Sequence, residues 1–206
     1  MAAAFAAGIF YGVIANLLAD LSLYGLNFGP LRQGLISRRG LAVTFLGLVF
    51  VLAAWHRAAG DPASLARDLT LGLPLLAITG TDLEARLIPN RLVLGGAVVG
   101  LGLATAEGRL PAAAAGAAAG LGLFGAVYLV GNRLYPGGFG AGDVKLAGLI
   151  GLELGLPAAL SGLFLGVLLG GLGALLLLAL RARRLKDPIP YGPFLCAGAA
   201  VGLLAT

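Results

Sequence analysis

Two aspartates in this chain of 206 residues have the side-chain type and the setting that hydrolytic chemistry requires. Asp82 ends an apolar run within TGTDLEARLIPN at 79–90, and Asp143 closes the glycine-rich segment GGFGAGD at 137–143. Two facing carboxyl groups do not both ionise readily, so near neutral pH one keeps a proton while the other is charged. The charged group can take a proton from water while the protonated group polarises a carbonyl, which hydrolyses a peptide without a covalent intermediate.

Each aspartate also has a simpler structural explanation when it is taken alone. Asp143 has the residue type and position of a helix N-cap, and Asp82 those of an interfacial residue at the end of a span. Glu84 is a rival carboxylate, but residues two apart on a helix do not share a face, so only one of Asp82 and Glu84 can point at a given partner. Gly140 and Gly142 permit close approach of another segment beside Asp143.

The sequence offers little for other hydrolytic mechanisms. Its single histidine, His56, lies in a different connection, and its single cysteine, Cys196, lies in the last apolar segment. Nucleophilic arrangements based on histidine are therefore disfavoured, and the ligands of a zinc hydrolase are lacking. We expect no metal, no cofactor and no disulfide within the chain.

The composition places these aspartates among membrane-embedded helices. Hydrophobic residues make up 59% of the chain and charged residues 11%, against about 25% charged in an ordinary soluble domain. Eight apolar stretches are separated by charge, Pro or Asn: 2–26, 41–59, 69–81, 91–106, 111–132, 143–155, 157–180 and 191–206. The first, second, fifth and seventh are long enough for a full span of about 17–25 residues. We predict an all-α, polytopic helical membrane protein with about eight (six to eight) transmembrane segments, forming a single membrane-embedded domain over 1–206.

Lysine and arginine are distributed unevenly between alternate connections. The odd connections carry Arg32, Arg38, Arg39, Arg86, Arg91, Arg133, Lys145, Arg181, Arg183, Arg184 and Lys186, and the even ones carry Arg57, Arg67 and Arg109. Because basic loops stay in the cytoplasm, this bias predicts cytoplasmic odd connections and both termini outside. Asp82 and Asp143 then both fall at the cytoplasmic edge of the membrane. The net charge of +5 is explained by this topology, and no nucleic-acid partner is expected.

The remaining acidic residues are expected to have structural roles. Asp61, Asp68, Glu107 and Asp187 are predicted to be solvated loop charges, and Glu153 an interfacial one. Asn16 and Asp20 are four residues apart, so they share one face of the first helix and can bond to each other or to a neighbouring helix.

Three motifs in chain order resemble the type IV prepilin peptidases, within the wider group of GxGD membrane aspartic proteases. They are DLEARLIPN at 82–90, GFGAGDVKLAGLIG at 138–151 and IPYGPFL at 189–195, with a weaker match in GIFYGVIAN at 8–16. The resemblance implies an aspartic endopeptidase of the cell (inner) membrane that removes the short basic leader of prepilin-like membrane proteins at the cytoplasmic face. Besides the lipid bilayer, such substrates are the expected partners.

The same resemblance assigns roles to individual residues. It implies that Asp82 and Asp143 are catalytic, and that Gly140, Gly142 and Lys145 support the second aspartate. An acidic residue such as Glu84 is better suited to bind a basic leader than the basic run at 181–186 is. The motif IPYGPFL is expected to shape the site or to brace the last span rather than to act in catalysis.

The sequence departs from the familiar bacterial members of that family in its first connection. Those members have a larger cytoplasmic domain there, often with paired Cys-x-x-Cys zinc ligands, whereas NFGPLRQGLISRRG at 27–40 contains no cysteine. The second span begins LAVTFLG and lacks the acidic residue expected near its start. We therefore expect a short form that is a peptidase without methyltransferase activity.

Two other classes of protein fit the same pattern. Intramembrane carboxylates and glycine-rich broken helices also occur in small transporters and channels. An inactive scaffold could keep the fold as well. Flux across a membrane without proteolysis would identify the former, and intact insertion without either activity the latter.

Overall fold

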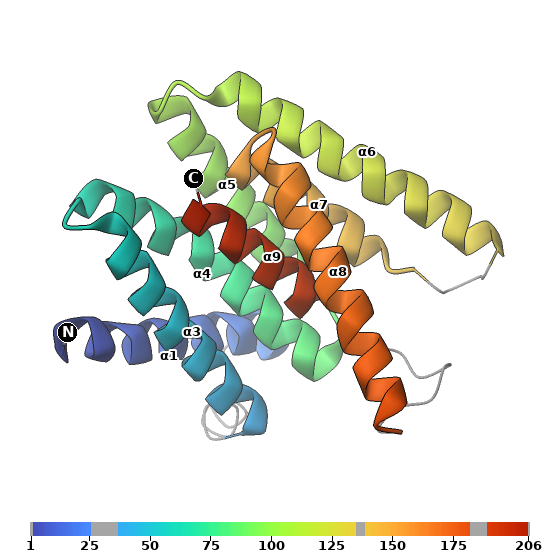
Figure 1. The fold of residues 1–206 in the computed structure, drawn as a ribbon, viewed down its shortest axis with the longest axis horizontal. Helices are drawn as coiled ribbons and strands as arrows, with labels where there is room; N and C mark the ends of the chain where they lie inside the picture. The colour runs from blue at the N-terminus through green and yellow to red at the C-terminus, as the bar shows by residue number, and fades with distance from the viewer. Residues whose placement is uncertain (1, 26–36, 135–138, 182–188, 206) are drawn as a thin grey trace.

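Helices account for nearly all of the computed structural model, which describes residues 2–25, 37–134, 139–181 and 189–205. In chain order they are α1 (Ala2–Tyr24), α3 (Arg38–Ala58), α4 (Pro62–Ala85), α5 (Asn90–Ala106), α6 (Leu110–Leu134), α7 (Ala141–Leu154), α8 (Ala158–Ala179) and α9 (Gly192–Ala205) (Figure 1). No strand occurs within the described residues. The prediction of an all-α, polytopic fold is confirmed, and each of the eight apolar segments overlaps one helix.

Four helices, α1, α3, α6 and α8, are long and apolar enough to cross a membrane by their length and composition. They correspond to the four segments that the sequence identified as full-length spans. Large apolar side chains are exposed on the outside of the bundle, among them Phe10, Val98 and Leu172, which are more than 60% exposed. Apolar surface on this scale is typical of a protein that faces lipid.

Helix α4 is longer than the predicted apolar segment at 69–81. It begins at Pro62 because the Asp61 side chain accepts hydrogen bonds from the backbone N–H groups of Ala63 and Ser64. An aspartate N-cap followed by proline at the first helical position is a strong start signal. The first turns of the helix are therefore polar, and Asp68 lies within the helix rather than in the preceding connection.

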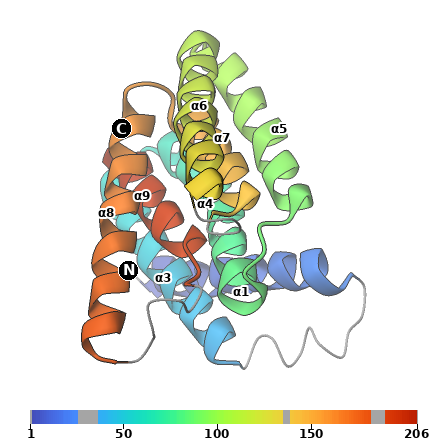
Figure 2. The same ribbon diagram turned by 90° about the vertical axis from the view of Figure 1, so that its right-hand side faces the viewer.

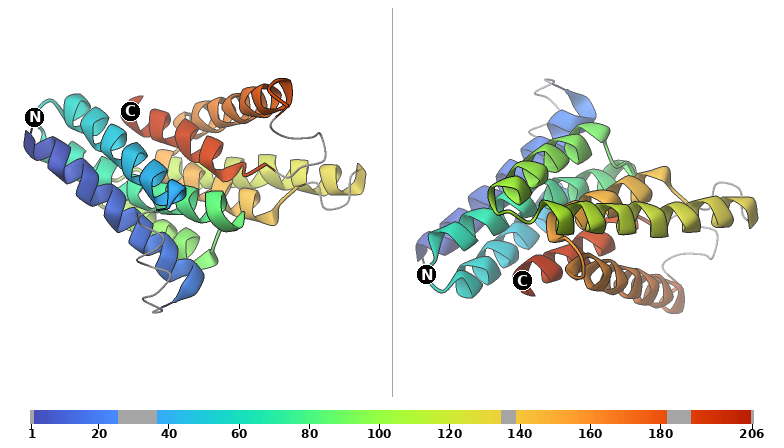
Figure 3. Two further views of the ribbon diagram at one scale, coloured as in Figure 1. Left: turned by 90° about the horizontal axis from the view of Figure 1, so that it is seen from below. Right: turned by 90° about the horizontal axis from the view of Figure 1, so that it is seen from above.

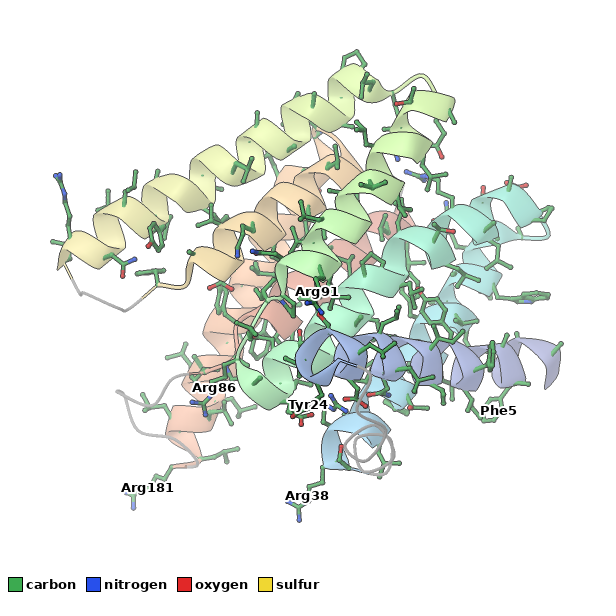
Figure 4. The ribbon with its side chains drawn as sticks, turned by 180° about the vertical axis from the view of Figure 1, so that it is seen from behind. Phe5, Tyr24, Arg38, Arg86, Arg91 and Arg181 are labelled. Atoms are coloured by element: carbon green, nitrogen blue, oxygen red, sulfur yellow. The ribbon has the colours of Figure 1, made fainter. Side chains whose placement is uncertain are left out.

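The helix ends separate into two sets. Both termini lie at the left of Figure 3 (left view), and the C-terminal ends of α6 and α8 lie at its right. From behind, Arg86 and Arg181 lie at the lower left and Arg38 at the bottom centre, whereas Phe5 in the first turn of α1 lies at the right (Figure 4). Three cations of the odd connections thus lie in the lower part of this view, whereas Arg91, from the same set, lies nearer its centre.

Close contacts through glycine hold α7 against α6. A Cβ on Gly116 of α6 would collide with the carbonyl of Gly151 of α7, and a Cβ on Gly151 would collide with that of Gly116. Small residues at such crossings let two backbones approach closely. Helix α7 lies among the other helices of the bundle (Figure 2) and also contacts α5, α8 and α9. The side chains of Leu146 and Ile150 are fully buried. The start of α7 is consequently held firmly in place.

A second set of contacts ties α1, α3 and the end of α4 together. The buried Arg39 of α3 pairs through Nη2 with Asp20 Oδ1 at 2.6 Å and through Nη1 with Glu84 Oε2 at 2.8 Å. Asn16 Nδ2 donates to the carbonyl of Gly40 at 3.0 Å and to Thr44 Oγ1 at 3.2 Å. Asn16 and Asp20 thus bond to the neighbouring helix rather than to each other in these contacts.

Two acidic residues that were expected at the surface are buried, so that expectation was wrong for both. Asp68 is fully buried in α4 and pairs with Arg57 at 2.8 Å. Glu153 is fully buried near the end of α7, and its carboxylate oxygens have no hydrogen-bond partner among the described residues. Asp68 was misplaced because α4 starts earlier than its apolar run, and Glu153 because neighbouring helices cover the end of α7. Asp187 and the run 182–186 lie outside the described residues.

Candidate active site

Asp82 lies in the last turn of α4, with 5% of its surface exposed. The helix ends where Arg86 adopts a left-handed conformation (φ 52°) and its N–H donates to the carbonyl of Asp82 at 3.0 Å. The carboxylate points inward, where Oδ2 accepts a hydrogen bond from the backbone N–H of Gly192 at 2.9 Å. Asp82 is therefore not the solvated interfacial residue that its position in the sequence also allowed.

Asp143 is the third residue of α7 rather than its N-cap. The N-cap is Gly140, whose carbonyl accepts from the Asp143 N–H at 3.2 Å. A Cβ on Gly142 would approach Ile88 Cβ to 3.2 Å, so the segment that follows α4 packs directly on the start of α7. This contact needs glycine and brings the Asp143 turn next to the end of the Asp82 helix.

Both carboxylates line one cavity of about 870 Å³. Its walls come from the end of α4 and the residues after it, from α6, from the start of α7, from α8 and from the residues before α9. Asp82 and Asp143 are close enough to interact electrostatically, and the other charged residues of the lining are Arg86 and Lys145. The remaining walls are mainly apolar, and a poorly hydrated setting strengthens the effect of each charge on the other.

The residues predicted to support the aspartates divide into two groups. Gly140, Gly142 and Lys145 line the same cavity, and Lys145 Nζ donates to Asn90 Oδ1 at 2.6 Å. Glu84 does not line it. Its carboxylate pairs with Arg39 and accepts from the hydroxyl of Tyr24 at 2.6 Å. The two carboxylates at the end of α4 thus have different partners.

Sequence reasoning allowed the last motif to shape the site but missed its contact with Asp82. In IPYGPFL the Gly192 N–H binds Asp82, and the half-buried Tyr191 lines the cavity. Gly192 is the first residue of α9, and the first N–H groups of a helix have no partner within it. The sequence did contain a signal for this contact. Gly192 stands between Pro190 and Pro193 at the start of a helix, where its backbone N–H has no partner within the helix and no side chain blocks the approach of an acceptor.

This arrangement can perform acid–base chemistry on a polar bond. Two carboxylates that interact across a small space share a proton and titrate as a coupled pair. One can accept a proton from water while the other stabilises negative charge on a carbonyl oxygen. The fold and site thus define a helical membrane protein with two aspartates in one cavity.

Comparison with known proteins assigns the chain to a family. The model of the type IV leader peptidase family matches residues 69–175, which is more than half of the chain and includes both aspartates. The chain therefore belongs to the type IV leader peptidase family.

Curated relatives carry the name prepilin leader peptidase/N-methyltransferase. One from Bacillus subtilis (strain 168) is 35% identical over 136 residues, covering 63% of this chain and 52% of the relative. One from Aeromonas salmonicida (strain A449) is 34% identical over 140 residues, covering 66% and 48%. One from Pseudomonas putida is 30% identical over 193 residues, covering 91% and 65%. The chain thus spans about half the length of the first two, and no solved structure matches it.

Proposed function

We propose that this chain is an aspartic endopeptidase that removes the short basic leader of type IV prepilin-like proteins at the cytoplasmic face of the cell (inner) membrane. The observation that carries the proposal is that Asp82 of α4 and Asp143 of α7 line the same largely apolar cavity. The relatives bear the name of such a peptidase, which supports the substrate class. Residues 1–206 act in this proposal as one membrane-embedded peptidase domain with both termini outside.

The proposed mechanism uses water as the nucleophile. One carboxylate of the pair takes a proton from water, and the oxygen attacks the scissile carbonyl carbon while the protonated carboxyl gives its proton to the carbonyl oxygen. The tetrahedral intermediate then collapses, the C–N bond breaks, and the leaving nitrogen takes the proton that the first carboxylate had accepted. The second carboxylate recovers its proton from the intermediate's hydroxyl group, so the pair returns to its starting state. The Gly192 N–H keeps Asp82 Oδ2 oriented throughout.

The sidedness and the chemistry can be tested together in membranes that contain the protein. A short peptide spanning a leader junction should be cut at one bond in inverted vesicles, which expose their cytoplasmic face, and remain intact with right-side-out vesicles. Mass spectrometry of the products locates the cut. Cleavage with right-side-out vesicles alone would overturn the proposed sidedness, and ion flux without cleavage in either preparation would favour the transporter class.

We further propose that the enzyme does not methylate the new N-terminus. The connection at 27–40 contains no cysteine, and the second span begins LAVTFLG without an acidic residue. With labelled S-adenosylmethionine in the same inverted vesicles, the cut product should stay unlabelled. Label on its N-terminal nitrogen would contradict this part of the proposal.

The Gly192 contact gives a prediction about how tightly Asp82 must be held. In Gly192→Ala a Cβ would lie 2.9 Å from Asp82 Oδ2, so the carboxylate must move. Because a displacement of about 1 Å in a catalytic group can cost about 10²-fold in rate, we expect leader cleavage to fall by about 10- to 100-fold. The measurement is the initial rate of cleavage by purified enzyme in liposomes.

Gly171→Ala is the matched control for this substitution. Gly171 lies in α8, and a Cβ there would meet no atom within 4 Å. This variant should cleave at the rate of the unmodified enzyme. Equal rates for Gly192→Ala and Gly171→Ala would show that the Gly192 N–H does not position Asp82.

A further inference from the structure

Two helices form an apolar groove that runs into the cavity of the two aspartates. On α6 the lining residues Leu123, Phe124 and Val127 share one face, and on α8 Leu163, Phe164 and Val167 share another. We call these six residues the α6–α8 groove. The groove carries no charged side chain, and it belongs to the same cavity as Asp82 and Asp143.

The groove has a buried floor and exposed rims. Phe124 and Leu163 form the floor, being 9% and 1% exposed. The rims are open: Leu123 is 51% exposed, Phe164 64%, and Val127 and Val167 each 42%. Since α6 and α8 are both long and apolar enough to span a membrane, their exposed side chains are expected to face lipid rather than water. The cavity therefore opens sideways, between two spanning helices.

The arrangement of the two helices fits such an opening. They start near each other and diverge toward their C-terminal ends in Figures 1 and 2. Helix α7, which carries Asp143 in its first turn, contacts both of them. An apolar segment that enters between α6 and α8 thus reaches the carboxylates without leaving the bilayer.

We infer that the α6–α8 groove is the docking surface and lateral entry path for the apolar segment of a membrane-embedded substrate, an inference that rests on the proposed function. Continuity with the two aspartates identifies the occupant as the part of the substrate next to the bond that is cut. The volume of about 870 Å³ is near the upper end of the range of about 300–1,000 Å³ that ligand pockets show, so the whole cavity holds a stretch of polypeptide.

The cavity lining disfavours the opposite orientation of the substrate. Its two aspartates are balanced by Arg86 and Lys145, so the lining offers a basic leader no excess of negative charge, and its apolar walls penalise any charged side chain. The leader is therefore held outside the cavity, and the apolar segment occupies the groove. A substrate that entered the cavity from the aqueous side would not contact the exposed apolar rims of the groove.

Substitutions to tryptophan on both helices test the inference directly. Val127→Trp and Val167→Trp fill the groove, whereas Val130→Trp changes an equally apolar residue of α6 that is 60% exposed and lies outside the cavity lining. The assay uses full-length enzyme and a membrane-embedded prepilin-like protein in the same liposomes. We expect kcat/KM to fall at least tenfold for the two groove variants, mainly through KM, and to stay unchanged for Val130→Trp.

Photocrosslinking provides a measurement that does not depend on activity. A benzoylphenylalanine at position 127 or 167, in an enzyme that also carries Asp143→Asn, should crosslink to the apolar segment of the substrate, and one at position 130 should not. Groove variants that cleave as Val130→Trp does, with equal crosslinking at all three positions, would overturn the docking surface and leave the proposed function standing. Absence of cleavage by the unmodified enzyme would overturn the proposed function and the docking inference with it.

Discussion

Replacement of either Asp82 or Asp143 by asparagine will reduce leader cleavage by about 10³-fold or more, within the range of about 10²–10⁴-fold that one acid–base group contributes. Asparagine keeps the size and polarity of the side chain but cannot exchange a proton with water or with the carbonyl oxygen. Both residues line the cavity, so neither substitution removes a packed apolar contact. The cleavage rate of a tagged prepilin-like substrate in liposomes measures the loss.

The double variant and a matched control sharpen this result. Because the proposed mechanism uses the two carboxylates as one unit, Asp82→Asn combined with Asp143→Asn should be no slower than either single variant. Asp61→Asn is the control, since it makes the same chemical change at the other end of α4, where asparagine caps a helix as well as aspartate does. Full cleavage by either Asp82→Asn or Asp143→Asn would remove that residue from the mechanism.

Arg39→Met will destabilise the folded protein by about 3–5 kcal/mol, the usual cost of removing one partner of a buried ion pair. Arg39 and Asp20 are both buried, with 7% and 0% of their side-chain surfaces exposed, so Asp20 would keep a charge without a counter-ion. The same guanidinium also pairs with Glu84, two residues from Asp82, so the end of α4 loses a support as well. Thermal unfolding in detergent should show a lower midpoint, and cleavage should fall with it.

The neighbouring Arg38 provides the control for this stability prediction. Arg38 is exposed at the start of α3, so Arg38→Met should leave the unfolding midpoint within a degree or two of the original. Adding Asp20→Leu to Arg39→Met should recover much of the stability, because replacing a buried pair by apolar residues is often neutral. If Arg39→Met and Arg38→Met unfold at the same temperature, the Arg39–Asp20 ion pair contributes little to stability.

The helices of this protein could be located from the sequence because the bilayer imposes a simple rule. A stretch in lipid must be apolar and must satisfy its own backbone hydrogen bonds, so long apolar runs become helices. The rule was least accurate for α4, where the helix signal was the cap at Asp61 and Pro62 rather than apolarity. It also says nothing about which side chains of a helix other helices will cover, and Asp68 and Glu153 were therefore misplaced.

The candidate site was predictable in part for a related reason. Glycine next to Asp143 and the end of an apolar run at Asp82 are local features, and a local pattern can be recognised from the sequence alone. The Gly192 N–H that binds Asp82 comes from a residue 110 positions away, so no local pattern contains that contact. Helix geometry predicts that Asp82 and Glu84 point in different directions. It does not predict which residues they contact.

The sequence by itself determined that the chain forms apolar helices and which connections carry the cations, and it predicted which two carboxylates stand at the same edge of the membrane. These properties depend on composition and order along the chain. Only the tertiary structure decided that Asp82 and Asp143 share a cavity, that α9 holds Asp82, and that α6 and α8 leave an apolar groove beside them. Such features depend on which helix faces meet, and that follows from packing through small residues such as Gly116 and Gly151 rather than from any single stretch of the chain.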